Sequence, residues 1–127
     1  MTKIKTAKEL EDTINFFTRI TEDFQNNIKN ESLHDYETQD ILHKLELEDV
    51  SYHDTAKLGK ALTKVRENRR KAKDSVELNA PLVEWIQSHS DALKSLQKLL
   101  GETRKIEDKQ RRRMYVPRTK IVEEVIH

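Results

Sequence analysis

Turn-forming residues are nearly absent from this chain: its 127 residues include two glycines and two prolines. A β-sandwich or β-barrel needs a turn rich in glycine or proline roughly every 8 to 12 residues. So few of these residues cannot supply that many turns, and we therefore expect an all-α fold.

The apolar residues are too few for a thick globular core. Hydrophobic residues make up 35% of the sequence and charged residues 37%, whereas an ordinary globular chain has roughly 45 to 50% apolar residues. Helices that each carry a narrow apolar stripe can still pair along a thin seam. We expect an elongated, antiparallel helical hairpin or coiled-coil-like bundle of about four helices, followed by an extended C-terminal tail.

Several classes of protein are excluded by composition. The chain contains no cysteine, which rules out disulfide bonds, thiolate zinc sites and cysteine nucleophiles. No segment approaches the roughly 18 apolar residues of a membrane span, and residues 1–8 lack the apolar run of a signal peptide. The net charge of +1 indicates neither an acidic nucleic-acid mimic nor a uniformly basic DNA-binding protein. We expect a cytoplasmic protein that does not contact a membrane.

Residues 1–50 predict an N-terminal helical hairpin. The sequence T-A-K-E from Thr6 has the pattern of a capping box, which predicts a helix start. Apolar residues then recur at alternating spacings of four and three, and Phe16 and Ile20 widen the stripe. The asparagines at 26–30 lower helix propensity, so we expect a break there and a second, shorter helix.

Residues 51–114 predict a longer, coiled-coil-like hairpin. Ser51 or Asp54 can cap its first helix. Behind this cap, seam positions recur every seven residues, at Leu58, Val65, Ala72, Asn79 and Ile86. Asn79 would be a buried polar residue that fixes the register of the pairing.

Pro81 interrupts the first arm of this hairpin, where it either kinks one long helix or starts another. The polar residues at 88–91 provide a turn and a cap, after which an apolar stripe runs back as far as Ile106. Residues 115–127 form the tail. It is expected to be extended near Pro117, because the residue before a proline avoids helical geometry.

Two clusters of basic residues lie far apart in the sequence. The predicted hairpin would place Arg66 opposite Arg112 and Arg69 opposite Lys109, so that the clusters form one patch. A basic patch beside an aromatic ring can bind a phosphate backbone and stack on bases. The candidate nucleic-acid-binding residues are Arg66, Arg69, Arg70, Lys109, Arg111, Arg112, Arg113 and Tyr115. The alternative is a solvated helix face with charge pairs four residues apart.

Three apolar residues are candidates for a protein interface: Phe16, Ile20 and Trp85. Trp85 lies on the flank of the predicted seam, where it is either an exposed anchor of the kind that dominates interfaces or packed against a neighbouring helix. Phe16 and Ile20 form a second apolar edge, which belongs either to the core or to the seam of a homo-oligomer. Narrow stripes bury little surface within one chain, so a partner would stabilise these edges.

The sequence does not indicate a catalytic or metal site. Carboxylate–x–x–His occurs three times with the spacing of paired ligands in di-metal bundles, at Glu31/His34, Asp40/His43 and Glu124/His127. We interpret these as surface residues, because Glu31 lies at the expected start of a helix and cannot project into a bundle core. Walker A, H-E-x-x-H, G-x-S-x-G and dinucleotide-binding glycine motifs are absent. We expect no enzymatic activity, no metal and no cofactor.

A general sequence pattern in the C-terminal half is carried by L-G-K from Leu58, V-R-E-N-R-R-K-A-K-D from Val65, P-L-V-E-W from Pro81 and R-M-Y-V-P-R from Arg113. In this pattern the chain resembles small helical proteins of unassigned role that are encoded by bacteriophages and prophages of Gram-positive bacteria. The resemblance implies a protein that binds a host or phage protein, or accompanies replication and recombination machinery. It assigns a role to no residue.

Together these patterns predict a non-catalytic helical protein that functions by binding another protein, as a phage-encoded accessory protein or inhibitor, and that forms a homo-oligomer. The alternative is a nucleic-acid-binding accessory protein that uses the basic patch. The first prediction requires the apolar interface residues to be exposed, whereas the alternative requires the two basic clusters to form one patch.

Overall fold

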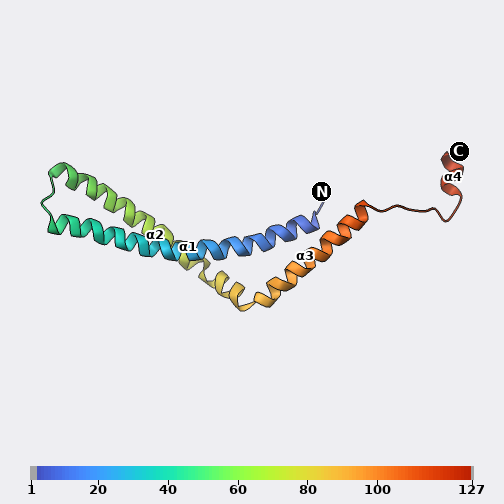
Figure 1. Cartoon of the computed structure of the whole chain (residues 1–127), viewed down its shortest axis with the longest axis horizontal. Helices are drawn as coiled ribbons and strands as arrows, with labels where there is room; N and C mark the ends of the chain where they lie inside the picture. The colour runs from blue at the N-terminus through green and yellow to red at the C-terminus, as the bar shows by residue number, and fades with distance from the viewer. Residues whose placement is uncertain (1–2, 127) are drawn as a thin grey trace.

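The computed structural model describes residues 3–126; Met1, Thr2 and His127 lie outside this range. Four helices make up the described chain: α1 (Thr6–Leu47), α2 (Tyr52–Ser88), α3 (Ser90–Arg111) and α4 (Ile121–Ile126). No strand occurs in this range, so the prediction of an all-α fold is confirmed. The molecule is elongated: α2 runs antiparallel to the C-terminal half of α1, and α3 packs on the N-terminal half (Figure 1).

Helix α1 is one continuous helix of 42 residues, which corrects the prediction of a hairpin over residues 1–50. Neither glycine nor proline occurs within it. The asparagines at 26–30 each disfavour a helix by less than about 0.7 kcal/mol, which is small beside the pairing of the helix with α2. Asn27 takes part in that pairing, because its side-chain amide donates to Ser75 Oγ of α2 at 3.1 Å.

The N-terminus of α1 is capped by α3. The backbone N–H of Ala7 donates to the carboxylate of Glu107 at 3.2 Å. Thr6 is not the cap that the T-A-K-E pattern predicted: Lys5 occupies the N-cap position and its side chain makes no capping hydrogen bond. A carboxylate at this end pairs an otherwise unbonded N–H and favours the positive end of the helix dipole. The contact joins the last turns of α3 to the first turn of α1.

Helix α2 is capped by Ser51, one of the two residues predicted to cap it. Ser51 is the N-cap, and its side-chain oxygen accepts from the backbone N–H of Asp54 at 3.2 Å. Pro81 lies inside the helix and does not divide it. Of the positions spaced by sevens, Ala72 and Ile86 are buried, so this spacing marks the packed face of α2. Asn79 is only half-buried and donates within its own helix, to Ser75 Oγ at 3.3 Å.

The helices pack along a narrow seam. Leu10 and Leu96 pack against the cluster that joins α1 and α3. Val83 of α2 is the most buried side chain, at 1% exposure. The buried apolar residues of the described chain are Ala7, Ile14, Ala72, Val83, Ile86 and Leu100. So small a set leaves most apolar surface of the protein at or near solvent.

Helix α3 does not fold back along α2, which corrects the predicted hairpin of residues 51–114. His89 alone separates the two helices, and α3 continues toward the N-terminal end of α1 (Figure 1). Contacts between α2 and α3 are few, whereas both helices pack on α1. The physical reason lies in α1, whose N-terminal turns carry Leu10 and Ile14 beyond the reach of α2. Leu100 of α3 covers this end of the stripe.

The chain beyond α3 stands apart from the packed helices. Residues 113–120 form no helix, and every residue from 113 to 126 is exposed. Helix α4 makes no contact with the other three helices in the described structure. Figure 1 shows this tail leading away from the end of α3. Of the predicted tail, His127 lies outside the described residues.

Because so few apolar side chains are buried, each should contribute a large part of the stability. We expect Leu100→Ala to lower the free energy of unfolding by about 2 to 5 kcal/mol, the loss typical of a buried leucine. Leu33→Ala removes the same atoms from a residue that is 53% exposed. This variant should change the free energy of unfolding by less than about 0.5 kcal/mol. Urea unfolding followed by circular dichroism measures both values. Equal losses in the two variants would contradict this assignment of the core.

Candidate protein-interaction site

Four rings form a continuous chain across the junction of α1, α2 and α3. Phe16 and Phe17 have ring centroids 5.9 Å apart, Phe17 and Trp85 6.1 Å, and Trp85 and His89 4.4 Å. These separations are typical of favourable aromatic pairs. Phe16 is 43% exposed and Trp85 46%. We call these four residues the aromatic cluster; it joins two of the residues predicted to form an interface.

The position of the aromatic cluster follows from the register of the helices. Phe17 is half-buried at the seam, and Phe16, one residue earlier, lies on the flank of the seam. Trp85 likewise precedes the buried Ile86. The alternatives for Trp85 were an exposed anchor or packing on a neighbouring helix, and the structure combines them: one part of the ring lies near Phe17 and nearly half remains exposed. Ile20, also half-buried, lies one helical turn beyond Phe16.

His89 is a member of the cluster that the sequence analysis treated only as part of a turn. Its ring stacks on Trp85 with an interplanar angle of 17°. Its Nδ1 lies 2.8 Å from the carbonyl oxygen of Trp85, which holds the imidazole against the indole. The spacing of four residues between Trp85 and His89 is the signal that could have found this contact, because such residues share a helix face.

The predicted nucleic-acid-binding residues do not come together. Those on α2 lie beside the C-terminal half of α1, whereas those near the end of α3 lie beyond its N-terminal end (Figure 1). The two groups are Arg66, Arg69 and Arg70 on α2, and Lys109, Arg111, Arg112, Arg113 and Tyr115 at and after the end of α3. The composite patch depended on α2 and α3 forming a hairpin. Since they do not, Arg66 does not face Arg112.

Arg69 pairs with α1 across the seam. Its Nε donates to Asp35 Oδ1 at 2.5 Å, and its Nη2 lies 3.8 Å from Glu31 Oε1. The side chain of Arg69 is 35% exposed. Two carboxylates therefore compensate its charge, and this residue aligns α2 on α1 instead of being available to a phosphate.

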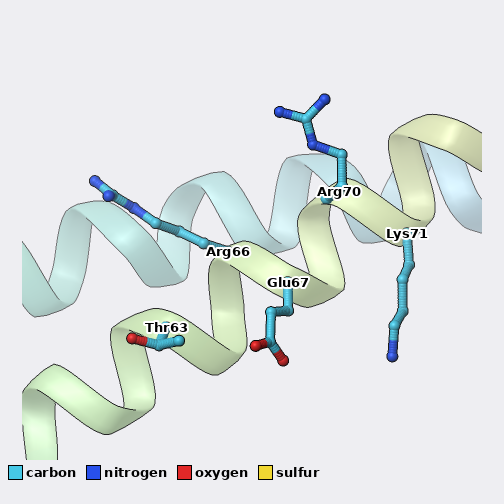
Figure 2. Close-up of a pocket in the computed structure, with 5 residues that line it drawn as sticks. All are labelled: Thr63, Arg66, Glu67, Arg70 and Lys71. Atoms are coloured by element: carbon cyan, nitrogen blue, oxygen red, sulfur yellow. The ribbon is translucent and has the colours of Figure 1, made fainter.

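Arg66 and Arg70 lie on the outer surface of α2. Together with neighbouring side chains they line a shallow depression, formed by Thr63, Arg66, Glu67, Arg70 and Lys71. Figure 2 shows that Arg66 and Arg70 point to one side of the helix, whereas Glu67 and Lys71 point to the other. The ion pairs found among the described residues include neither guanidinium. The side chains diverge, so the depression offers no convergent site for an anion.

The basic residues at the end of α3 form a smaller, local cluster. Arg111 and Arg112 both lie near Asp108, with nitrogen–oxygen distances of 3.7 and 3.4 Å. Arg113 and Tyr115 follow in the tail, where Tyr115 is 74% exposed. These residues are accessible, but they belong to a different part of the surface from the aromatic cluster.

Neither a metal site nor a membrane span is found within residues 3–126. In this range no three histidine, aspartate or glutamate side chains are arranged to hold a metal ion. Of the predicted surface pairs, Glu31 lies near Arg69, while His34 Nδ1 lies 2.7 Å from Glu37 Oε1. His127 of the third pair lies outside the described residues. None of the described helices has both the length and the hydropathy needed to cross a bilayer.

Comparison with known proteins identifies no relative from which a function could be transferred. The chain matches no protein-family model, no curated protein and no solved structure. The interpretation of the site therefore depends on its own geometry, in which the aromatic cluster combines ring contacts between helices with two nearly half-exposed aromatic side chains.

Arg69 and Arg70 provide a matched pair to test which arginine is structural. We expect Arg69→Met to lower the free energy of unfolding by about 1 kcal/mol, because Asp35 and Glu31 lose their cation on a partly exposed seam. Arg70→Met, which removes an exposed and unpaired guanidinium, should change it by less than about 0.5 kcal/mol. Thermal or urea unfolding of the two variants measures the difference. The assignment is wrong if Arg70→Met costs more stability than Arg69→Met.

Proposed function

We propose that this protein functions by binding another protein and that it is not an enzyme. The observation that carries the proposal is the aromatic cluster, in which Phe16 and Trp85 are each nearly half exposed. Aromatic side chains, tryptophan above all, contribute much of the binding energy at protein interfaces. Phe16, Ile20 and Trp85 are the proposed contact residues.

The packed helices support this role because they hold the side chains of the aromatic cluster in fixed positions. Phe17 and Ile86 anchor the exposed rings to the seam, so a partner would meet side chains that are already ordered, which reduces the entropy lost on binding. Two hollows on the described surface are shallow. One lies on α1, lined by polar residues that include Asp12 and Arg19. A surface of this kind favours recognition over enclosure of a small substrate.

The resemblance of the C-terminal half to small phage and prophage proteins supports a narrower role. In this proposal the chain is a phage-encoded accessory protein or inhibitor whose target is a host or phage protein. The exposed tail that follows α3 would be available to the same target, since no described helix covers it.

Nucleic-acid binding is the second candidate, and the tail is the observation that favours it. Arg113 and the exposed Tyr115 lie together on an extended segment after the arginines that end α3. Arginine side chains can neutralise phosphates while a tyrosine ring stacks on a base. This candidate no longer includes a composite patch with α2, and Arg69 is engaged by carboxylates.

A photoreactive residue at position 16 tests the main proposal. Substitution of Phe16 by p-benzoylphenylalanine keeps an aromatic ring in place, and irradiation in cells that produce the protein should yield adducts with one or a few proteins, including another copy of this chain. Trp85→Ala in the same chain should abolish these adducts, because the ring is part of the contact. The control carries the same residue at Thr18, on the other side of α1. Absence of protein adducts at position 16, or equal adducts at position 18, would contradict the proposal.

Gel retardation of a short DNA and a short RNA separates the second candidate from the first. Under the main proposal we expect no retardation at moderate salt. Binding that falls steeply as the salt concentration rises, and that is weakened by Arg112→Glu with Arg113→Glu, would instead support nucleic-acid binding through the tail. An Arg70→Glu variant is the control, since it places the same charge change on α2.

A further inference from the structure

The joint between α2 and α3 consists of a single residue, His89. Its backbone has φ −120° and ψ 37°, whereas α-helical values are about −63° and −42°. Its N–H donates to the carbonyl oxygens of Trp85 and Ile86, and its carbonyl oxygen accepts from the N–H groups of Ala92 and Leu93. Apart from this joint the two helices make few contacts. The direction of α3 therefore depends on the backbone dihedral angles of one residue and on the contacts of α3 with α1.

A small apolar cluster holds α3 on α1. Leu96 and Leu100 of α3 pack with Ala7, Leu10 and Ile14 of α1. Leu100 is the buried residue of α3, and Leu96 is only partly buried. This is a small apolar contact for a helix of 22 residues.

Two polar contacts secure the far end of α3. The backbone N–H of Ala7 donates to Glu107 Oε1 at 3.2 Å, and Arg104 Nη2 donates to Glu11 Oε2 at 2.8 Å. The Arg104 side chain is 54% exposed, and an ion pair in water contributes little to stability. Both contacts lie about 22 to 27 Å from His89, at about 1.5 Å per residue of helix. They can therefore be removed without altering the joint or the aromatic cluster.

Helix α2, by contrast, is joined to α1 at separate places along its length. Arg69 pairs with Asp35 in one part of α2, and Trp85 contacts Phe17 near its C-terminal end. Segments with few buried contacts open at a lower free energy than the rest of a protein. We therefore expect α3 to leave α1 while α1 and α2 remain paired.

The joint is also part of the aromatic cluster. The His89 ring stacks on Trp85 with centroids 4.4 Å apart, and its Nδ1 lies 2.8 Å from the carbonyl oxygen of Trp85. Rotation about the N–Cα bond of His89 moves its side chain and α3 together, because both follow that bond. A swing of α3 about this bond therefore removes the imidazole from the face of the indole.

We propose that α3 is a hinged arm that controls access to Trp85: it swings away from α1 about the N–Cα bond of His89 and thereby uncovers the indole face. In the closed arrangement the imidazole occupies this face, whereas in the open arrangement an aromatic or apolar side chain of a partner protein can stack on it. Opening also exposes Leu10 and Ile14 of α1 to the partner. The inference rests on the proposed function and adds the regulation of the same site.

Spin labels on α1 and α3 measure the position of the arm directly. The chain contains no cysteine, so Thr13→Cys and Lys109→Cys, both at exposed positions, introduce the only two labels. Pulsed electron resonance should show one short distance with a minor population at longer distances. Gln39→Cys with Lys64→Cys, which labels exposed positions on α1 and α2, is the control and should show a single distance.

Glu107→Ala combined with Arg104→Ala should raise the ratio of open to closed arm about 5-fold or more, the effect of losing a helix cap. In the unlabelled chain, acrylamide quenching of Trp85, the only tryptophan, should increase in this variant, because the imidazole leaves the indole. The matched control is Glu102→Ala with Lys105→Ala. It removes the same two charges from exposed positions of α3 that take no part in the described polar contacts with α1, and it should change neither measurement.

Three results would overturn this inference. The distance from α1 to α3 could stay single and short in the double variant, or the distance from α1 to α2 could widen with it, which would mean that the whole fold loosens. The arm could also open without a change in the quenching of Trp85, which would show that His89 does not couple the two.

The photoreactive residue at position 16 separates this inference from the proposed function. Glu107→Ala with Arg104→Ala should increase the yield of protein adducts. Adducts that form in equal yield with and without these substitutions leave the proposed function standing and remove its regulation by α3. If neither chain forms adducts, the proposed function fails and the regulatory role fails with it, whereas the label distances and the quenching still decide whether the arm opens.

Discussion

The successive pairing of α2 and α3 with a single uninterrupted α1 determines where the other features lie. Helix α2 reaches back along α1 as far as Phe17, which Trp85 contacts. The apolar turns before that point, with Ile14, remain for α3 to cover through Leu100. The change of direction at His89 is the geometric consequence, and the hydrogen bond from Ala7 to Glu107 secures the far end.

The aromatic cluster lies at the place where α1 passes from one partner helix to the other. At this junction the seam cannot enclose every ring, because α2 is ending and α3 starts in a new direction. Phe17 is held at the seam while Phe16 and Trp85 remain nearly half exposed. The feature that most favours a binding role is thus produced by the same pairing that builds the fold, and it needs no irregular loop to present it.

Local sequence patterns predicted the helices and their faces but not their partners. The scarcity of glycine and proline was enough for the all-α fold, and the seven-residue spacing found the face that buries Ala72 and Ile86. The break expected at 26–30 does not occur, since propensities of a few tenths of a kcal/mol yield to tertiary pairing. The direction of α3 was missed because a turn pattern shows where a chain bends, not which helix it then meets.

The candidate site was predictable to a similar extent. Phe16 and Trp85 were recognisable as apolar residues beside a stripe, yet the ring that joins them, Phe17, belongs to a contact between residues 68 positions apart. Arg69 could not be separated from Arg70 by sequence alone, because its carboxylate partner Asp35 lies on another helix. Both the Phe17–Trp85 contact and the Arg69–Asp35 ion pair depend on how α2 is aligned along α1. The local periodicity of the sequence contains no information about that alignment.

The chemistry of the seam links stability to binding. Between α1 and α2 several of the contacts are polar, among them Asn27 with Ser75 and Arg69 with Asp35. Such contacts fix register, but each contributes only about 1 kcal/mol in net terms, so apolar burial has to supply most of the driving force. Phe16 and Trp85 are among the apolar side chains that remain exposed beside the seam. A partner that covers them would bind only the folded chain, and its binding would therefore stabilise the fold by mass action.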